Sequence, residues 1–522
     1  MKSKEENDLR ETVEALLKNL IDGPSASIYA VLTQFAKDNI HGTLTAYSIW
    51  HHLEGSEHHF RRRKWANDPR ILAKVQEAND AYLLYQRTAT IGGRVIPRAA
   101  VHSIVEQLTK PDNPHDILIT GEAGSGKSCV FQQAVEKLIE TGTPLLALRL
   151  DLLDPVLLPR DIGQQRDLPG SPVQVLADIA QGQCCILALD QLDAVSLSFD
   201  RTPKFLHCID LLLEEAHAYP HMRLLVTCRQ FYLEHDEQIR QCLLTHGLEH
   251  HVMIERLTDK QIRQLVADMG WDAERLSEKQ LELLSYPLHL SLLARVPCTS
   301  ATVFDFRTAN DLYQRLWTHK DRVLRRRLHG QPINWVSVMD TLCDYMSDHQ
   351  ILFAPESVAY GREFVAEAMV SEQILIKTGK RYAFFHESFF DYAFAYQFVS
   401  KQRELVPFLL EGEQSLFRRD QVRQVLLQER AEDLSMNDPR YLSDLRNLLT
   451  DGGIRSHIKQ VVFALLAELE DPVEEEWQTL AAHLDDPVYP YQRDIWNVLH
   501  RSVSWFRLLD SLERRSRNQA AS

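Results

Sequence analysis

One stretch of this 522-residue chain has the residue types and spacing of a phosphate-binding loop. It reads G-x-x-x-x-G-K-S, and its glycines allow backbone N–H groups to turn toward phosphate oxygens. The helix expected after it adds partial positive charge at the same place. Lys127 should reach the β- and γ-phosphates, and the hydroxyl of Ser128 should ligate Mg²⁺. The loop therefore predicts binding of ATP or ADP with Mg²⁺ by Gly121, Glu122, Ala123, Gly124, Ser125, Gly126, Lys127, Ser128 and Cys129.

A second group of chemically capable residues follows an apolar run. Residues 185–189 are apolar and lead into Asp190, which is the Walker B pattern, and Asp190 is expected to hold Mg²⁺ through water. The next position, where a catalytic glutamate is usual, is Gln191. An amide orients water but accepts a proton poorly, which leaves Asp193 as the candidate base. We therefore expect slow hydrolysis of ATP.

A third polar group follows the apolar run 224–226. Thr227, Cys228 and Arg229 come directly after it. The guanidinium of Arg229 has a fixed fork that matches phosphate oxygens, so it is a candidate sensor of the γ-phosphate. The alternative is that Arg229 pairs with a surface carboxylate. The candidate catalytic residues are thus Lys127, Asp190, Asp193 and Arg229.

The elements that must position these residues are short apolar runs separated by helix-compatible stretches. Each run has the length of a strand buried on both faces, and this alternation is typical of a parallel sheet covered by helices. The runs are 117–120, 145–150, 185–189, 224–227 and 252–254. The predicted fold class is an α/β P-loop NTPase core with a parallel sheet of the ASCE type.

The rest of the chain is expected to be mainly helical. A hairpin at 374–385 that precedes a helix indicates a winged helix, and the paired helical stretches 421–430, 440–450, 454–469, 473–484 and 491–511 indicate stacked α-hairpins. The predicted domains are a helical N-terminal segment (1–90), the P-loop NTPase domain (91–256), a helical lid (257–300), a winged-helix-like domain (301–400) and a HEAT-like α-helical region (401–522).

Composition narrows the function classes. Hydrophobic residues at 44% with no long apolar run and no signal peptide predict a cytoplasmic protein without a membrane partner. The net charge of −15 makes nucleic acid an unexpected partner, although the basic runs 61–64 and 325–327 could form local phosphate-binding patches or solvated helix faces. The eight cysteines, Cys298 among them, show no spacing that suits zinc or a disulfide framework.

With these motifs in order, the chain resembles the STAND class of P-loop ATPases, which includes the NACHT and NB-ARC modules, over roughly residues 94–400. The stretches that carry the resemblance are Asp-Gln-Leu-Asp at 190–193, Thr-Cys-Arg at 227–229, Tyr-Pro-Leu-His-Leu at 286–290 and the segments 94–98 and 382–392. The resemblance implies that the backbone of Ile96, Pro97 and Arg98 meets the adenine. It also implies that Pro287 packs against the nucleotide and that His386 contacts the β-phosphate of ADP in a closed form. The simpler alternatives are that Pro287 only bounds a helix and that His386 only makes a local hydrogen bond.

The same resemblance implies a function. Residues 148–151, 171–173 and 189–195 look like those of bacterial STAND proteins of phage defence. The implied function is an ATP/ADP-controlled switch that opens and oligomerises with itself on ATP exchange, answering an unidentified trigger and acting through a separate effector. Two alternatives stay open. One is an AAA+-like remodelling or DNA-loading ATPase, which should bind DNA in a salt-sensitive way, and the other is a scaffold that holds nucleotide without exchanging it.

Overall fold

The computed structural model describes most of the chain. The described residues are 10, 13–14, 17, 21–40, 46–58, 60–62, 65, 68–86, 91–110, 115–195, 202–297, 304–329, 334–433, 440–484, 486 and 488–520. Arg63 and Lys64 of the first basic run, and Cys298, lie outside them. The chain forms two compact units, one of Met1–Ser196 with Arg201–Arg256 and one of Leu197–Asp200 with Leu257–Ser522. Each unit is described by itself.

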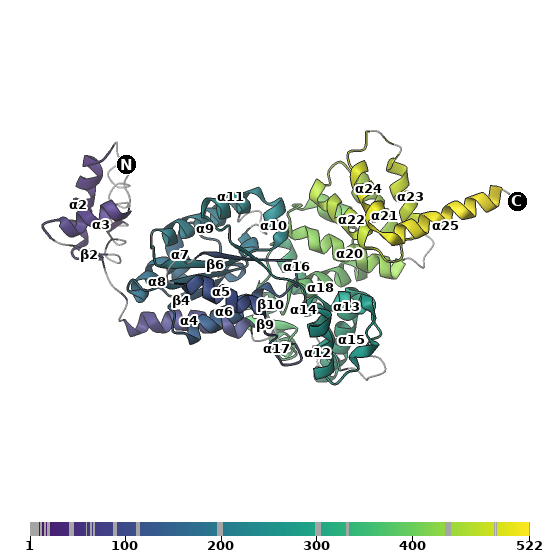
Figure 1. The fold of residues 1–522 in the computed structure, drawn as a ribbon, viewed down its shortest axis with the longest axis horizontal. Helices are drawn as coiled ribbons and strands as arrows, with labels where there is room; N and C mark the ends of the chain where they lie inside the picture. Colours follow the sequence, from purple (N-terminus) through teal and green to yellow (C-terminus); the bar gives the residue numbers. More distant parts are fainter. Residues whose placement is uncertain are drawn as a thin grey trace. The chain divides into compact units, whose positions relative to one another are not determined.

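A five-stranded sheet forms the centre of the first unit. Its strands are β3 (Ile117–Thr120), β4 (Leu145–Arg149), β5 (Cys185–Asp190), β6 (Met222–Thr227) and β7 (His251–Met253). Figure 1 labels β4 and β6 of this sheet. They lie in the order β4-β5-β6-β3-β7, and every neighbouring pair is parallel. Strand β6 thus separates the strand before the phosphate loop from the strand that ends in Asp190. The predicted ASCE-type P-loop core is confirmed.

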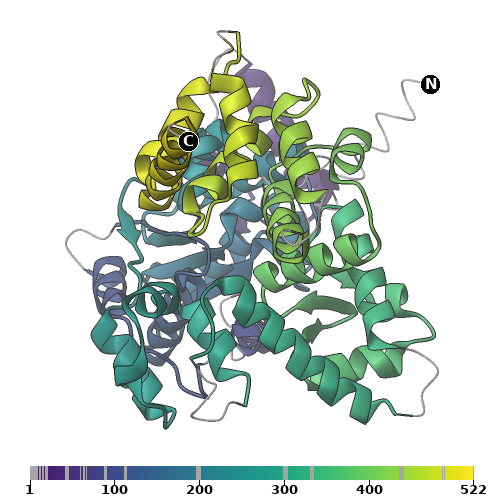
Figure 2. The same ribbon diagram turned by 90° about the vertical axis from the view of Figure 1, so that its right-hand side faces the viewer.

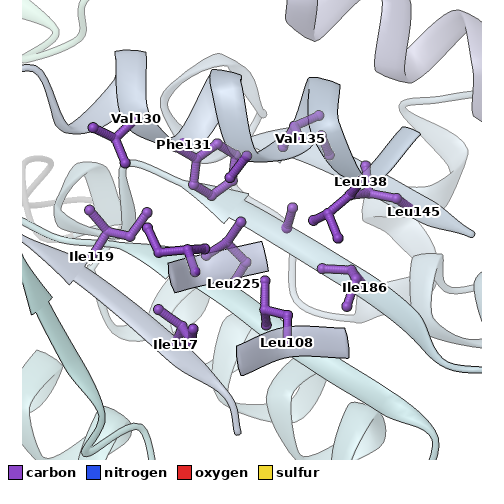
Figure 3. Packing of buried hydrophobic residues seen from close by; sticks show 14 of the residues in the cluster. Leu108, Ile117, Ile119, Val130, Phe131, Val135, Leu138, Leu145, Ile186 and Leu225 are labelled. Carbon is purple, nitrogen blue, oxygen red and sulfur yellow. The ribbon is translucent and has the colours of Figure 1, made fainter. Parts of the chain in front are cut away.

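The sheet is held by apolar side chains on the helix that comes after the phosphate loop. Helix α6 (Lys127–Glu140) packs one face onto the strands, together with α5 (Ala99–Thr109). Figure 3 shows this packing, in which the labelled residues are Leu108, Ile117, Ile119, Val130, Phe131, Val135, Leu138, Leu145, Ile186 and Leu225. All but Leu145 are fully buried, and each such side chain stabilises the fold by about 1.5–3 kcal/mol. The start of α6, which bears the phosphate-binding residues, is thereby fixed on the sheet.

Further helices complete the first unit. They are α7 (Pro159–Gln164), α8 (Pro172–Ala180), α9 (Thr202–His217), α10 (Gln230–His235) and α11 (Glu237–Thr245). Helices α8 and α9 pack against the sheet strands β5 and β6, respectively. Strands that are apolar throughout need cover on both faces of the sheet. Helices α5 and α6 provide part of this cover, and α8 and α9 provide a further part.

The N-terminal part contains helices, as predicted, and also a small strand pair that the sequence did not indicate. The helices are α2 (Ser25–Asp38), α3 (Ala46–Gly55) and α4 (Pro69–Gln86). Strand β1 (Ile21–Asp22) pairs antiparallel with β2 (Arg61–Arg62). Two residues per strand leave no periodicity to read, and the pairing joins segments far apart in sequence. Helix α4 is attached to the sheet, because Asn79 bonds the carbonyl of Leu145 and the N–H of Ala147 on the outer strand β4, both at 2.8 Å.

The second unit begins with helices and a winged helix. The helices α12 (Asp259–Asp268), α13 (Glu278–Leu284) and α14 (Pro287–Ala294) come first. The winged helix comes next, with α15 (Ala309–Arg327), α16 (Trp335–Asp348), α17 (Glu363–Ser371), α18 (Glu387–Ser400) and a sheet ordered β8-β10-β9. Its strands are β8 (Ala354–Pro355), β9 (Leu375–Thr378) and β10 (Arg381–Phe384), and the last two form the predicted hairpin.

The unit ends in a stack of helices, coloured light green to yellow in Figure 2. They are α19 (Leu405–Glu411), α20 (Phe417–Asp433), α21 (Arg440–Thr450), α22 (Ser456–Glu468), α23 (Glu474–Leu484), α24 (Gln492–Arg501) and α25 (Val503–Ala520). The prediction of one helical stretch over 491–511 is wrong, because the backbone is extended at Ser502. The break lets Trp505 turn fully inward and donate to the carbonyl of Leu466 at 2.7 Å. No helix in the described part of the chain is both long and apolar enough to cross a bilayer.

One buried carboxyl in this stack gives a pH-dependent prediction. Asp444 of α21 is 7% exposed, and burial raises its pKa from 3.8 to about 6, against the opposing hydrogen bond with Glu429. A raised carboxyl pKa favours the fold while the group is protonated, so stability falls as the pH rises from about 4 to above 6. The shift corresponds to about 3 kcal/mol as an upper value.

Asp444→Asn should therefore raise the free energy of unfolding by about 1–3 kcal/mol at pH 7 and have little effect at pH 4. Chemical unfolding of the full chain at the two pH values measures this difference. The control is Asp510→Asn, since Asp510 is 43% exposed and pairs with Arg514 at the surface of α25. Equal behaviour of the two variants would show that Asp444 is not a destabilising buried acid.

Candidate nucleotide-binding site

The phosphate loop lies between β3 and α6 and needs its glycines. Gly121, Gly124 and Gly126 have φ angles of +152°, +75° and +94°, a region that side chains with a Cβ rarely adopt. A Cβ on Gly121 would also lie 2.9 Å from Ser125 Oγ and 3.2 Å from the carbonyl oxygen of Ile254. The chain reverses tightly here and turns its backbone toward the carboxyl edge of the sheet, where open α/β sheets bind ligands.

The side chains of the loop fit an anion. Lys127 Nζ donates to the carbonyl oxygens of Gly121 and Glu122, at 3.0 and 2.8 Å. The ammonium group therefore lies next to the first residues of the phosphate loop. Ser125 Oγ is buried and has no hydrogen-bond partner within the described residues. A buried hydroxyl of this kind ordinarily has a partner, and a phosphate oxygen at the loop would supply one. The charge and the unmet donor therefore match the predicted ligand.

The other predicted loop residues differ in exposure. Ala123 and Glu122 are exposed, and Glu122 forms an ion pair with Arg256 at 2.8 Å. Ser128 is half-buried in the first turn of α6. Burial raises the pKa of the Cys129 thiol to about 11, so that Cys129 is a neutral neighbour of the site. Ser128 supplies a hydroxyl oxygen and Asp190 a carboxylate, the donors that Mg²⁺ prefers.

Asp190 is the last residue of β5 and is fully buried. Its two oxygens accept from different elements: Thr227 Oγ1 on β6 donates to Oδ1 at 2.6 Å, and Tyr82 Oη on α4 donates to Oδ2 at 3.1 Å. Burial raises the pKa of Asp190, while the positive charge of Arg149 and the bond from Thr227 oppose the rise. The carboxylate is thus held in one orientation at the carboxyl edge of the sheet.

Gln191 is directed to a buried ion pair. Arg149 and Asp151, at the end of β4, pair with side-chain exposures of 6% and 5%. With the amide in the orientation that satisfies both of its ends, Gln191 donates to Asp151 at 3.2 Å and accepts from Arg149 at 3.0 Å. Its backbone is left-handed, with φ of +61°, and its N–H donates to Thr227 Oγ1 at 2.8 Å. Gln191 occupies the position that usually carries the catalytic glutamate, and its side chain is hydrogen-bonded to the Arg149–Asp151 pair.

Asp193 and Arg229 are paired with each other. Arg229 Nε lies 2.9 Å from Asp193 Oδ2, and the backbone N–H of Arg229 donates to Asp193 Oδ1 at 3.1 Å. Their side chains are 3% and 11% exposed, respectively. Arg229 therefore pairs with a carboxylate, but with a buried one and not with the surface carboxylate of the alternative. Both oxygens of Asp193 are thus engaged, and Asp193 would have to release Arg229 before it could act as a base.

The segment before α5 is fixed beside the loop. The carbonyl oxygen of Ile96 accepts from Gln133 of α6 at 2.9 Å, and Arg98 donates to the carbonyl oxygen of Glu255. Burial lowers the pKa of Arg98. Pro97 lies between these two anchored residues. The segment predicted to meet the adenine is thus tied to the helix that comes after the phosphate loop.

Two predicted nucleotide contacts belong to the second unit. Pro287 is the first residue of α14, and His386 precedes α18, where its Nδ1 accepts from the N–H of Ser388 at 3.1 Å. Both residues therefore have local roles at helix starts. Their contacts with nucleotide remain predictions, because each unit is described by itself.

Tyr82 is a site residue that sequence reasoning missed. It comes from α4, within the segment expected to lie outside the P-loop domain, and a tyrosine in an amphipathic helix carries no motif. Its contact with Asp190 joins positions 108 residues apart. Only the docking of α4 on β4 brings the two together.

A second set of possible metal ligands lies elsewhere in the first unit. Asp210 of α9, Cys242 of α11 and His246 offer ligand atoms within 4.8 Å of one another. Asp210 Oδ1 and His246 Nε2 are 2.8 Å apart, a hydrogen-bond distance, and the ring of His246 stacks on His217. These contacts account for the grouping without an ion.

Comparison with known proteins gives similarity at the level of the fold. No protein-family model and no curated protein matches the chain. Among solved structures, the Walker-type ATPase PABY2304 of Pyrococcus abyssi is 13% identical, with a TM-score of 0.30, and the match covers 57% of this chain and 95% of that one. The Aeropyrum pernix ORC1 protein in complex with DNA is 12% identical, with a TM-score of 0.29, over 62% of this chain and 98% of that one.

The ADP form of the Aeropyrum pernix ORC2 protein is 10% identical, with a TM-score of 0.28, over 57% of this chain and 93% of that one. These values describe a distant likeness and assign no activity. The chain's own features carry more: parallel strands in the order β4-β5-β6-β3-β7, a glycine-built phosphate loop after β3 and a buried aspartate at the end of β5. The chain therefore has the core fold of a P-loop NTPase of the ASCE type.

Proposed function

We propose that this chain is a STAND-type molecular switch that binds ATP or ADP, hydrolyses ATP slowly, and opens and assembles with itself when ATP replaces ADP. One observation carries the proposal. The phosphate loop can bind nucleotide, whereas the two residues that could activate water, Gln191 and Asp193, are bonded to other side chains. Ser128 and Asp190 would hold Mg²⁺, which would supply positive charge to the phosphates. The chain's own residues determine how long the bound ATP survives.

Slow hydrolysis results from the partners of the two candidate water-activating residues. A general base must be within hydrogen-bond reach of the water and free to take its proton. Gln191 is an amide engaged with Arg149 and Asp151. Asp193 has both oxygens engaged by Arg229. A site of this kind favours long occupancy over rapid turnover, as a switch requires.

The pairing of Asp193 with Arg229 also supports a difference between the two nucleotides. Arg229 matches a phosphate group in shape and charge, and only ATP carries the γ-phosphate. If Arg229 leaves Asp193 for that phosphate, ATP stabilises an arrangement that ADP does not. A ligand shifts a conformational equilibrium only by its difference in affinity for the two forms, and a shift from 1:99 to 99:1 needs about 10⁴-fold. Contacts of Pro287 and His386 with ADP would add to this difference.

A partner protein completes the proposal. The chain would respond to an unidentified trigger and pass the signal to a separate effector, and a role in bacterial defence rests on the resemblance of its motifs. Phage challenge of cells that carry or lack the intact chain would test that role, and equal survival would contradict it.

The alternative is a DNA-loading ATPase, a use suggested by the ORC1 protein seen in complex with DNA. The charges of the winged helix favour the switch. Lys377 on the hairpin strand β9 pairs with Glu356 and Glu367, at 2.9 and 2.6 Å. Arg327, from the second basic run, pairs with Glu372 at 3.2 Å. Cations paired in this way have less charge to offer to a DNA backbone. Salt-sensitive DNA binding would favour the loader.

The test of the switch is the nucleotide content and the mass of the purified protein, with and without ATP. We expect ADP to co-purify with a monomer, and larger assemblies to appear in ATP but not in an ADP control. A monomer that turns over ATP many times per second and never changes mass would contradict the switch. A chain that holds nucleotide without exchange or assembly would support the scaffold instead.

A further inference from the structure

We propose that Tyr82 is a positioning residue for Asp190, and that α4 thereby couples the N-terminal segment to the occupancy of the nucleotide site. This inference rests on the proposed nucleotide binding and adds a regulatory contact to it. The carrying observation is a hydrogen bond from a helix that precedes the phosphate loop to the carboxylate that ends β5.

The first step is the state of Asp190. The residue is fully buried, and its carboxylate receives one donor on each oxygen, from Thr227 and from Tyr82. Hydrogen bonds to a charged group contribute more than neutral ones, and more still where water is excluded. Removal of the phenol leaves Oδ2 without the donor that Tyr82 provides. Thr227 alone then leaves the carboxylate free to turn about that single bond.

The second step is the placement of Tyr82 between two motifs. Its hydroxyl bonds Asp190 at the end of the Walker B strand, and its ring packs on Phe131 of α6, with ring centroids 5.5 Å apart. Phe131 lies one turn after Lys127, in the helix that starts the phosphate site. Tyr82 is 4% exposed and belongs to the same apolar cluster as Phe131. A displacement of the Walker B strand or of the helix after the phosphate loop therefore changes a contact of Tyr82.

The third step is the attachment of α4 to the sheet. Asn79 lies one turn before Tyr82, and its amide bonds Leu145 and Ala147 at 2.8 Å, as a neighbouring strand would. Lys74, further toward the start of α4, lies 3.5 Å from the carboxylate of Asp167. The helix is thus clamped to the outer strand β4 and reaches the nucleotide site through Tyr82. Nucleotide that restrains Asp190 should restrain α4, and displacement of α4 should release Asp190.

The test is Tyr82→Phe, which keeps the ring and removes the donor. Binding of a fluorescent ADP to the full chain is titrated with Mg²⁺. We expect the variant to need about tenfold more Mg²⁺ for half-maximal binding, the equivalent of one hydrogen bond to a charged group. Hydrogen exchange of α4 supplies the second readout: nucleotide with Mg²⁺ should slow it in the wild-type chain and have a smaller effect in Tyr82→Phe.

Two further variants separate positioning from general loosening. Tyr441→Phe is the matched control, because Tyr441 is also buried and also donates to a carboxylate, Glu476 Oε1 at 2.7 Å, within the second unit. It should leave the Mg²⁺ requirement unchanged. Asn79→Ala loosens α4 without removing the donor, and should raise the requirement in the same direction by a smaller factor.

The outcomes distinguish the two proposals. A wild-type chain that binds nucleotide, with a Tyr82→Phe variant of unchanged or lower Mg²⁺ requirement, would overturn this inference alone. A requirement raised equally by Tyr82→Phe and Tyr441→Phe would also overturn it, since the effect would then be one of stability. A wild-type chain that binds no nucleotide would overturn the proposed function and this inference with it.

Discussion

Lys127→Ala is expected to lower the affinity for ATP and ADP by about two orders of magnitude. Lys127 Nζ lies on the carbonyl oxygens of Gly121 and Glu122, within the loop whose backbone would surround the phosphates. An ammonium there contributes charge-assisted bonds to phosphate oxygens, and a methyl group contributes none. The fold should change little, because the carbonyl oxygen of Gly121 still accepts from the N–H of Gln230 at 3.2 Å and Glu122 is exposed. Calorimetric titration of the full chain with each nucleotide measures the loss.

Two comparison variants make the result specific. Lys137→Ala removes an equal charge from the same helix, where Lys137 is 59% exposed and pairs with Glu140, and it should keep the wild-type affinity. Lys127→Arg keeps the charge but changes its shape, and should bind with intermediate affinity. Wild-type affinity in Lys127→Ala would mean that nucleotide binds elsewhere and would remove the basis of the proposed switch.

Glu476→Ala should destabilise the C-terminal helices by about 3–5 kcal/mol, the range for breaking a buried ion pair. Glu476 is fully buried in α23 and accepts from Arg430 and Tyr441, both at 2.7 Å, and from the N–H of Val473 at 2.8 Å. Removal of the carboxylate leaves the guanidinium of Arg430, 11% exposed, without its buried partner. Chemical unfolding, followed by hydrogen exchange in α20, α21 and α23, measures the effect.

The neighbouring residue supplies the control for this change. Glu475 is exposed on the same turn of α23, so Glu475→Ala should alter the free energy of unfolding by no more than about 0.5 kcal/mol. Similar melting of the two variants would contradict the assignment of Glu476 as the centre of a buried network. The comparison also tests the packing of α20 against α23, since Arg430 and Glu476 belong to these two helices.

The phosphate loop shows which parts of the site can be predicted from local sequence alone. The loop, the strand before it and the helix after it are contiguous, so their spacing alone predicts a cradle for phosphate. The apolar runs likewise predicted the strands of the sheet to within about a residue or two, because a strand buried on both faces must be apolar throughout. The Walker B aspartate and the missing glutamate at Gln191 could be read in the same way.

The sequence also indicated candidate site residues, but it could not predict which of them contact each other. Asp193 and Arg229 were each assigned a possible role toward nucleotide, as base and as sensor. Whether they face the nucleotide or each other depends on how β5 and β6 lie side by side, and in the structure they pair. The helical stretch 491–511 had a consistent pattern, yet the burial of Trp505 against α22 interrupts it at Ser502.

The sequence by itself determined that the chain has a P-loop core, which residues form the loop and that the usual catalytic glutamate is replaced. These are properties of neighbours along the chain, where residue type and spacing suffice. Tertiary structure alone decided that Tyr82 holds Asp190, that Asn79 fastens α4 to β4 and that Gln191 joins the Arg149–Asp151 pair. Each of these joins residues of different elements through one side-chain bond. Such a bond leaves no periodicity in the sequence, because it depends on the register and docking of whole strands and helices.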